Sequence, residues 1–387
     1  MRPRRSSRLK RVENTTVEPS AKAKKAVLCV KTVVGITLTE RWTNEYHRRS
    51  LSGIGRRVAH KRRAAFALRA SSVLRSTLYE AGNRPIAHAF ANQLAGLGAD
   101  VSHILYSKFG RMGVYYAEHG SNMRGSNVIY DRDYSTISLL GPESYNFETM
   151  LDGVTHLHLS GITPALTENA YKSTLAIAQT AEKMGITISV DLNYRKKLWN
   201  WEEETPKNEL ACRCMSKIVP LADIIIGNEE DAADVFGIYA AETSIDKGKL
   251  NIAGYKEVAS KLSEKFPKAK FVAITLRESI SAEHNNWGGM LFDCQKKQAY
   301  FAPLNEEGNY APYKIKNIVD RFGGGDSFCA GLLFALLSGE YTDNSEVIRF
   351  AVAASALKHT IYGDYNYASQ GEVISLMNGS ASGRVQR

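Results

Sequence analysis

The sequence is poor in features that are typical of secreted and membrane proteins. Its cysteines are an odd number and widely scattered, namely Cys29, Cys212, Cys214, Cys294 and Cys329. This usage excludes a disulfide-rich scaffold and predicts reduced thiols in a cytoplasmic compartment. The longest apolar stretch, residues 26–38, is interrupted by Lys31 and falls short of the roughly 18 residues that a membrane span needs. We therefore expect no contact with a membrane.

Aspartate is absent from residues 1–82, and this absence marks a break in composition. Residues 1–80 carry 20 Lys and Arg side chains against five glutamates, whereas the rest of the chain carries 30 basic and 35 acidic side chains. The net charge of +10 therefore arises in the first fifth of the chain, which is rich in Arg, Ser and Ala. Such a segment resembles a mitochondrial transit peptide or a nucleic-acid-binding arm. It lacks interleaved aromatic residues that would stack on bases, so nucleic-acid binding is not favoured.

From residue 83 onward the hydrophobic pattern alternates between helices and strands. Helices are predicted over 85–97, 167–184, 208–219 and 255–266, and strands over 114–117, 127–131, 155–159, 186–190, 224–226 and 271–274. This alternation indicates an α/β fold with a mostly parallel sheet and helices on both faces. We assign residues 83–376 to one domain and residues 377–387 to a C-terminal tail. In residues 1–82 the pattern predicts one strand, over 26–34.

Three glycines, Gly323, Gly324 and Gly325, lie directly ahead of a small and apolar helix. Glycines at that place let backbone amides converge on an anion, and the helix dipole adds partial positive charge. Phosphoryl transfer needs such a site, because negative charge builds on the oxygens of the moving group. Asp326 follows in the first helical turn, where a carboxylate can accept the proton of an attacking hydroxyl. The alternative is a plain turn in which Asp326 only offsets the helix dipole.

The glycines belong to a longer signature. Residues 320–326 read Asp-Arg-Phe-Gly-Gly-Gly-Asp and match the pattern Asp-x-x-Gly-x-Gly-Asp of the ribokinase-like (PfkB) carbohydrate kinases. A Walker loop would need Gly-Lys-Ser/Thr, and no His-Arg-Asp loop of a protein kinase accompanies the glycines. Arg321 and Phe322 resemble the 2-keto-3-deoxygluconate kinase branch of the family. The resemblance runs from about residue 85 to the C-terminus, roughly three quarters of the chain.

This resemblance implies a fold, an activity and catalytic roles. The fold is ribokinase-like, with a small lid sheet beside the central sheet. The activity is ATP-dependent phosphorylation of 2-keto-3-deoxy-D-gluconate, an acidic sugar, at its 6-hydroxyl. Asp326 is the implied base and the amides of Gly323, Gly324 and Gly325 the implied anion hole. The implied cofactors are ATP and Mg²⁺, with a monovalent cation as a further candidate.

Four more side chains are candidate ligands of the sugar. Arg195 follows a predicted strand in Asp-Leu-Asn-Tyr-Arg (residues 191–195), where its guanidinium can clamp a carboxylate. Tyr130 and Arg132 share one strand face, and Tyr115 matches a further tyrosine of the same branch. A shift of the strand by one residue would put Tyr116 in place of Tyr115. Without the resemblance, these residues would be interpreted as packing or surface residues.

Candidate nucleotide ligands follow other predicted strands. Asn228 and Asp231 lie in Gly-Asn-Glu-Glu-Asp (residues 227–231), which resembles the family's Asn-x-x-Glu element associated with Mg²⁺ and phosphates. Asp231 stands where Glu is usual, and an acidic helix start is the alternative interpretation. By resemblance Thr275, Arg277, Asp320 and Asn366 also belong to the ATP site, as do Gly323 and Gly325.

Three alternatives stay open. The first is a fructokinase or another PfkB kinase with a neutral substrate, although Arg132 and Arg195 suit a sugar with a carboxylate. The second is an inactive relative with a basic binding arm, because the family's first strand, lid strands and Gly-Gly-x-x-x-Asn motif are not recognised in residues 1–82. The third is that residues 1–82 are the product of a shifted reading frame. A homo-oligomer is compatible with the sequence.

Two further patterns favour structural over metal-binding roles. His156 and His158 share one face of a predicted strand, but no third ligand is placed near them. Cys212 and Cys214 lie in a predicted helix without the second pair that a zinc site would need.

Overall fold

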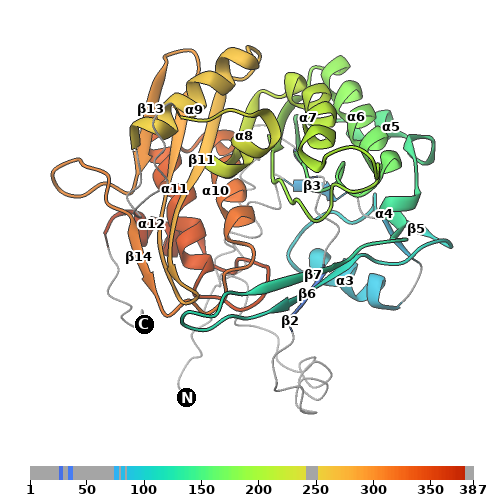
Figure 1. Cartoon of the computed structure of the whole chain (residues 1–387), viewed down its shortest axis with the longest axis horizontal. Helices are drawn as coiled ribbons and strands as arrows, with labels where there is room; N and C mark the ends of the chain where they lie inside the picture. Colours follow the sequence, from blue (N-terminus) through green and yellow to red (C-terminus); the bar gives the residue numbers. More distant parts are fainter. Residues whose placement is uncertain are drawn as a thin grey trace, which may run out of the picture.

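The computed structural model describes residues 85–240 and 252–379, together with the backbone of four short strands nearer the N-terminus. Its central element is a nine-stranded sheet with the order β13-β12-β11-β10-β9-β8-β1-β3, in which β14 also pairs with β12 (Figure 1). The parallel strands are β1 (Ala26–Leu28), β3 (Leu74–Thr77), β8 (His156–Ser160), β9 (Thr187–Asp191), β10 (Ile224–Asn228) and β11 (Phe271–Ser281). The antiparallel edge consists of β12 (His284–Asp293), β13 (Gln298–Ala302) and β14 (Tyr313–Lys316).

Helices cover both faces of this sheet, as the side-chain alternation of the strands requires. Ile225 of β10 packs into the core formed with helices α6 (Glu168–Lys183), α7 (Lys207–Ile218), α8 (Glu229–Phe236) and α9 (Ile252–Lys265). Its neighbours Ile224 and Ile226 pack into a second core, formed with α10 (Gly324–Ser338), α11 (Asn344–Lys358) and α12 (Gln370–Met377). Adjacent strand residues therefore bury apolar surface against opposite helical layers.

A second, smaller sheet lies beside the central one and has the order β2-β6-β7. Its strands are β2 (Val34–Thr37), β6 (Val114–Glu118) and β7 (Asn127–Asp131), and β6 and β7 form an antiparallel hairpin. Among the hydrogen bonds from the hairpin to the main body, the amide of Ala282 donates to the carbonyl of Asn122 at 2.8 Å, and Lys197 donates to the carbonyl of Val128 at 3.1 Å. Figure 1 shows this sheet crossing below the central sheet, near α3.

Short elements complete the described chain. Helix α3 (Pro85–Gly96) buries Phe90 and Leu94 in a third, small core that Tyr116 of β6 also contacts. The others are the parallel pair β4 (Glu80–Gly82) and β5 (Leu105–Ser107), the helices α4 (Thr136–Leu139) and α5 (Phe147–Leu151), and the 3₁₀ turns Pro142–Ser144 and Val219–Leu221. In residues 85–240 and 252–379 no helix is long and apolar enough to cross a bilayer.

The predicted α/β class and the helical layers on both faces are confirmed. Each predicted helix and strand from residue 85 to 274 is present with bounds within a few residues, except that β11 continues to Ser281. The strand predicted over 26–34 is present in part: residues 26–28 form β1 in the central sheet and Val34 begins β2 in the small sheet, while residues 29–33 lie outside the described part of the chain. β1 pairs with β8 and β2 pairs with β6, so residues 1–82 contribute strands to both sheets. The sequence pattern did not predict β2, because edge pairing through the backbone needs little side-chain pattern.

His156 and His158 have a structural role, as expected. Both rings lie within 2.8 Å of the Ser189 hydroxyl on the neighbouring strand, and both are buried. Burial lowers the pKa of His156 from 6.5 to about 4, and Asp223 opposes this only in part. His156 is therefore neutral in the folded protein at neutral pH.

This shift predicts acid sensitivity of the fold. Between pH 6.5 and about 4 the unfolded chain binds a proton at residue 156 that the folded chain does not, so the free energy of unfolding falls as the pH falls through this window. Near pH 5 the effect amounts to about 2 kcal/mol. Urea unfolding of His156→Asn should show a correspondingly weaker pH dependence than wild type. His88→Asn, on the surface of α3, is the matched control, and equal slopes for wild type and His156→Asn would refute the assignment.

Candidate active site

The glycine turn forms the start of α10. Gly323 is the N-cap residue and adopts a left-handed conformation with φ of 78°. The first helical hydrogen bond runs from the amide of Ser327 to the carbonyl of Gly323 at 2.8 Å. The preceding amides of Gly324, Gly325 and Asp326 therefore point out of the helix start, where a bound anion would meet them. This is the backbone geometry that the predicted anion site requires.

Two neighbouring segments fix the turn in place. A Cβ atom at residue 323 would overlap the carbonyl oxygen of Asp364 and lie 3.3 Å from Cε of Lys358, so only glycine fits. The buried Asp320 bridges the two segments, because its carboxylate accepts from the amides of Phe322 at 3.0 Å and Gly363 at 2.9 Å. Asp320 therefore positions the turn from beneath and lies outside the cavity lining.

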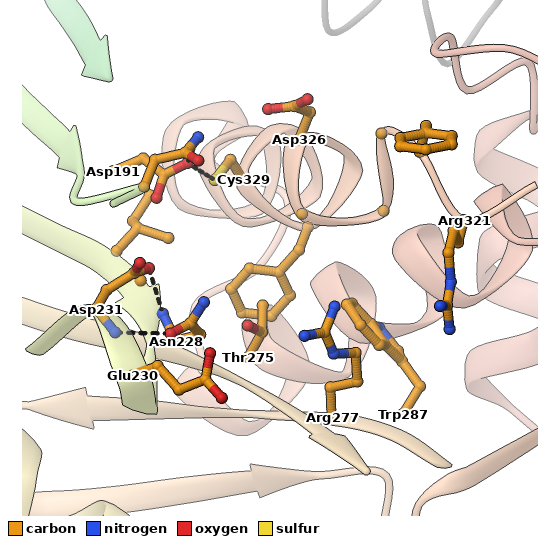
Figure 2. Close-up of a pocket in the computed structure, with 18 of the residues that line it drawn as sticks. Asp191, Asn228, Glu230, Asp231, Thr275, Arg277, Trp287, Arg321, Asp326 and Cys329 are labelled. Carbon is orange, nitrogen blue, oxygen red and sulfur yellow. Dashed lines mark hydrogen bonds between the residues drawn. The ribbon is translucent and has the colours of Figure 1, made fainter. Parts of the chain in front are cut away.

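A cavity of about 270 Å³ opens beside the turn, at the carboxyl ends of β9 and β10 and along β11 (Figure 2). Among the residues predicted as ligands, it is lined by Arg195, Asn228, Asp231, Thr275, Arg277, Gly323, Gly324, Gly325 and Asp326. These come from segments more than 100 residues apart, and the parallel strands bring them to one edge of the sheet. In Figure 2 the carboxylate of Asp326 projects from the first turn of α10 on the side opposite Thr275 and Arg277.

Asn228 and Asp231 fix the start of α8. Asn228 accepts from the amide of Asp231 at 2.8 Å, and Asp231 accepts from the amides of Asn228 at 3.0 Å and Tyr194 at 2.9 Å. This is a capping box, extended to the loop after β9. Asp231 therefore caps the start of an acidic helix, as the alternative interpretation of the sequence predicted. One of its carboxylate oxygens accepts from Asn228 and the other from Tyr194. Glu230, next to it, also lines the cavity.

Positive charge gathers on the opposite wall. Arg321 lies near Arg277, and it donates to the side-chain oxygen of Asn285 at 3.0 Å. Burial lowers the pKa of Arg321, and the charge of Arg277 adds to this effect. Two guanidinium groups held together in this way favour a polyanionic ligand between them, such as a nucleotide phosphate chain.

An aromatic pair beside these arginines was not anticipated from the sequence. Trp287 of β12 and His359 pack edge to face with ring centroids 4.8 Å apart, and both line the cavity. Trp287 donates to the hydroxyl of Ser355 at 2.6 Å. Nδ1 of His359 lies 2.9 Å from the carbonyl of Ser355, and burial lowers the pKa of His359 to about 4. The ring is thus neutral and donates through Nδ1, because a carbonyl can only accept.

The small sheet carries the other predicted sugar ligands. Tyr115 and Tyr130 are directly opposite each other in the β6–β7 hairpin, and Arg132 lies with its guanidinium carbon 4.8 Å from the ring centre of Tyr130. Tyr115 donates to Asp364 at 2.7 Å and packs near Phe322 of the glycine turn. Its pKa is raised by burial first and then by Asp364, Asp326 and Asp320. Tyr115 therefore faces the turn, whereas Tyr116 packs against α3.

Asn366 does not line the cavity. Its side-chain nitrogen donates to the carbonyl of Ala354 at 2.9 Å, and its side-chain oxygen accepts from the amide of Ala368 at 3.0 Å. The cavity lining does not include it, nor Tyr115, Tyr130 and Arg132. Other lining residues that sequence reasoning missed are Asp191, Asn193, Asn285, Phe328 and Cys329. Of these five, only Asp191 and Asn193 could have been found from the sequence, because they belong to the Asp-Leu-Asn-Tyr-Arg segment (residues 191–195) in which Arg195 was predicted as a ligand.

The donor set in the cavity is compatible with Mg²⁺ shared with phosphates. In the described part of the chain no three His, Cys, Asp or Glu side chains are arranged to hold a metal by themselves. Carboxylates of Glu230 and Asp231 nevertheless line the same cavity as Thr275 and Asn228. Mg²⁺ commonly takes one or two carboxylates and completes its shell with substrate phosphates and water. The residues present therefore fit that ion.

Fold and site together define a phosphotransferase that handles a small hydroxyl compound, and comparison with known proteins agrees. The model of the pfkB family carbohydrate kinases matches residues 76–278 and 291–370, well over half of the chain. The chain therefore belongs to the pfkB family of carbohydrate kinases, and it is a sugar kinase with the ribokinase-like fold.

Individual relatives refine this picture. A 2-dehydro-3-deoxygalactonokinase from Haloferax volcanii is 27% identical over 299 residues, which cover 77% of this chain and 80% of the relative. The crystal structure of a 2-dehydro-3-deoxygluconokinase from Thermotoga maritima is 35% identical with a TM-score of 0.71, and the match covers 82% of this chain and 88% of that one. A fructokinase double mutant from Vibrio cholerae, with fructose, ADP and potassium bound, shares the fold at 17% identity, a TM-score of 0.64 and coverage of 92% and 99%.

The glycine turn generates a prediction about stability. Gly323→Ala should lower the free energy of unfolding by about 2 to 4 kcal/mol, because the methyl group overlaps Asp364 and the left-handed backbone disfavours any side chain. Gly325→Ala is the matched control, since a Cβ there meets nothing within 4 Å. It should leave stability unchanged or raise it by up to about 1 kcal/mol. Urea unfolding of both variants is the measurement, and equal stability of the two would contradict the proposed packing.

Proposed function

We propose that this chain transfers the γ-phosphoryl group of ATP to the 6-hydroxyl of 2-keto-3-deoxy-D-gluconate. The observation that carries the proposal is the position of Asp326, whose exposed carboxylate stands in the same helical turn as the outward-pointing amides of Gly324 and Gly325. One helical turn thereby offers both a base and an anion hole to a reacting group bound beside it. The family membership and the names of the similar kinases support the choice of reaction and of substrate class.

The chemical step follows from this arrangement. Asp326 accepts the proton of the 6-hydroxyl as the hydroxyl oxygen attacks the γ-phosphorus in line. The new P–O bond forms while the bond from the γ-phosphorus to the β,γ-bridging oxygen breaks, so the products are the 6-phosphate and ADP. The amides at the start of α10 receive the charge that develops on the moving phosphoryl oxygens, at no cost of reorganisation because the turn is rigid. Positioning and electrostatics thus supply most of the catalysis.

The nucleotide side of the cavity has matching chemistry. Arg277 and Arg321 offer positive charge to the phosphates, and Asn228 and Thr275 offer polar groups beside them. Asp231, with Glu230 beside it, would hold Mg²⁺ when the ion is bound, and the ion supplies further neutralisation of the phosphate oxygens. Trp287 and His359 add an aromatic wall, which suits the base or ribose of a nucleotide.

The sugar side favours a carboxylate. Arg195 lines the cavity, and Tyr115 joins the hairpin of the small sheet to Asp364 next to the glycine turn. Arg132, held over the Tyr130 ring, adds a buried cation in the same hairpin. We infer that Tyr115, Tyr130, Arg132 and Arg195 bind an acidic sugar rather than a neutral one, because the guanidinium groups of Arg132 and Arg195 can each form charge-assisted hydrogen bonds with a carboxylate. The 2-keto-3-deoxy acids of the gluconate and galactonate series differ only in the configuration at C4, so both carry the carboxylate that these residues would bind.

Replacement of the base gives the first functional prediction. Asp326→Asn should lower kcat by about 10³-fold, since general-base catalysis contributes about 10²- to 10⁴-fold and the oxyanion geometry is retained. The ATP dissociation constant should change little. Asp152→Asn, at the exposed end of α5, is the matched control and should keep wild-type kcat. Normal turnover by Asp326→Asn in a coupled assay of ADP formation would exclude Asp326 as the base.

Specificity for an acid gives the second prediction. Arg195→Gln should raise KM for 2-keto-3-deoxygluconate by about 30-fold, with less than about threefold change in KM for ATP, because one charge-assisted contact is worth about 2 kcal/mol. Arg124→Gln, at an exposed arginine of the β6–β7 turn, is the control and should leave both values unchanged. An equal loss with fructose as substrate would argue against carboxylate recognition and favour a kinase of neutral sugars.

A further inference from the structure

Lys358 is a buried ammonium group for which the steps above assign no role. It is the last residue of α11, and none of its surface is exposed. Its ammonium donates to the carbonyl of Ile361 at 2.9 Å. Burying a lysine charge is costly unless opposite charges surround it, so such a residue needs an explanation.

Three aspartates around the glycine turn supply those opposite charges. Burial lowers the pKa of Lys358, whereas Asp320, Asp364 and Asp326, in that order, favour its charged form. Two of these carboxylates already hold the turn: Asp320 accepts from Phe322 and Gly363, and Asp364 accepts from Tyr115. The side chain of Lys358 also lies against the Gly323 backbone. The ammonium is thus directly beneath the anion-binding turn.

The balance of charge explains why a cation belongs there. Three carboxylates close to the turn would repel the phosphates of ATP and the phosphoryl group during transfer. Oxygen atoms of carboxylates and of a backbone carbonyl are also the ligands that a hard monovalent cation would use. The resemblance to the family leads one to expect such an ion. In this chain, the side chain of Lys358 already brings a positive charge to these oxygens.

We propose that Lys358 is a built-in cation that takes the place of a bound monovalent ion, holds the Ile361–Asp364 segment against the glycine turn, and frees the enzyme from a requirement for potassium. Lys358 is a positioning residue, because its ammonium donates to the carbonyl of Ile361, its stem lies against the Gly323 backbone, and the residue itself is not part of the cavity lining. The inference rests on the proposed function only where it concerns turnover. Its effect on nucleotide binding is independent of the sugar.

The first experiment uses the wild-type full chain. ATP binding by calorimetry, and turnover with 2-keto-3-deoxygluconate, are measured in potassium chloride, sodium chloride and choline chloride at equal ionic strength of about 0.1 M. The proposal predicts that Kd, KM for ATP and kcat agree within about twofold in the three salts. An increase in affinity or kcat of about tenfold or more with potassium would overturn it. If no sugar is phosphorylated, the proposed substrate fails while the binding comparison still tests Lys358.

The second experiment removes the charge. Lys358→Met keeps the apolar stem of the side chain and removes only the ammonium group, and Lys172→Met, at an exposed lysine of α6, is the matched control. In choline chloride Lys358→Met should bind ATP at least about tenfold more weakly than the control, and potassium or methylammonium should restore part of the loss. A merely structural role would give a loss that no cation restores. A folded Lys358→Met variant with wild-type affinity in choline would also overturn the proposal.

Thermal unfolding covers the case of a poorly folded variant. The melting temperature of Lys358→Met should rise with potassium more than with choline, whereas that of Lys172→Met should respond equally to both. An equal response of the two variants would contradict the proposal. If Lys358→Met cannot be purified in any salt, the comparison of salts on the wild-type chain decides.

Discussion

The backbone of Gly323 lies so close to the carbonyl of Asp364 that no side chain fits between them, and the site depends on this contact. It joins the segment before α10 to the segment after α11, two parts of the chain about 40 residues apart. Asp320 adds hydrogen bonds to both segments from below. The amides at the start of α10 are therefore held in one orientation before any ligand arrives, which is the condition for electrostatic catalysis without reorganisation. The same helix start fixes the position of Asp326, which lies in the first turn of α10.

The central sheet and the small sheet each bring a different set of side chains toward this turn. The ends of β9 and β10 and the course of β11 bring the polar residues of the cavity to one edge of the sheet. The β6–β7 hairpin brings tyrosines and an arginine from the opposite direction, and the hydrogen bond from Tyr115 to Asp364 ties it to the turn. Around the glycine turn, Arg277 and Arg321 lie near each other, and Lys358 lies near Asp320, Asp364 and Asp326.

Much of the site could be predicted because its residues follow strands or start helices, where sequence patterns are strong. The signature from Asp320 to Asp326 needed glycine for physical reasons that the structure makes plain. The antiparallel strand β12 was missed, and its Gly288 and Gly289 show why: Gly289 is packed so tightly against Phe328 and Val352 that a side chain cannot be accommodated, so the strand lacks the usual apolar pattern. Trp287 was missed with it. The role of Lys358 was also beyond sequence reasoning, since lysine is normally a surface residue and its burial depends on distant aspartates.

The most direct measurement is the fate of the phosphoryl group when the full wild-type chain is incubated with ATP, Mg²⁺ and 2-keto-3-deoxygluconate. ADP formation can be followed continuously, and ³¹P–¹H correlation spectroscopy identifies the carbon that carries the new phosphate. The account predicts rapid ADP formation that depends on the acidic sugar, little with fructose or ribose, and a product phosphorus coupled to the two protons on C6. Absence of sugar-dependent ADP formation, or a phosphate on a different hydroxyl, would contradict it.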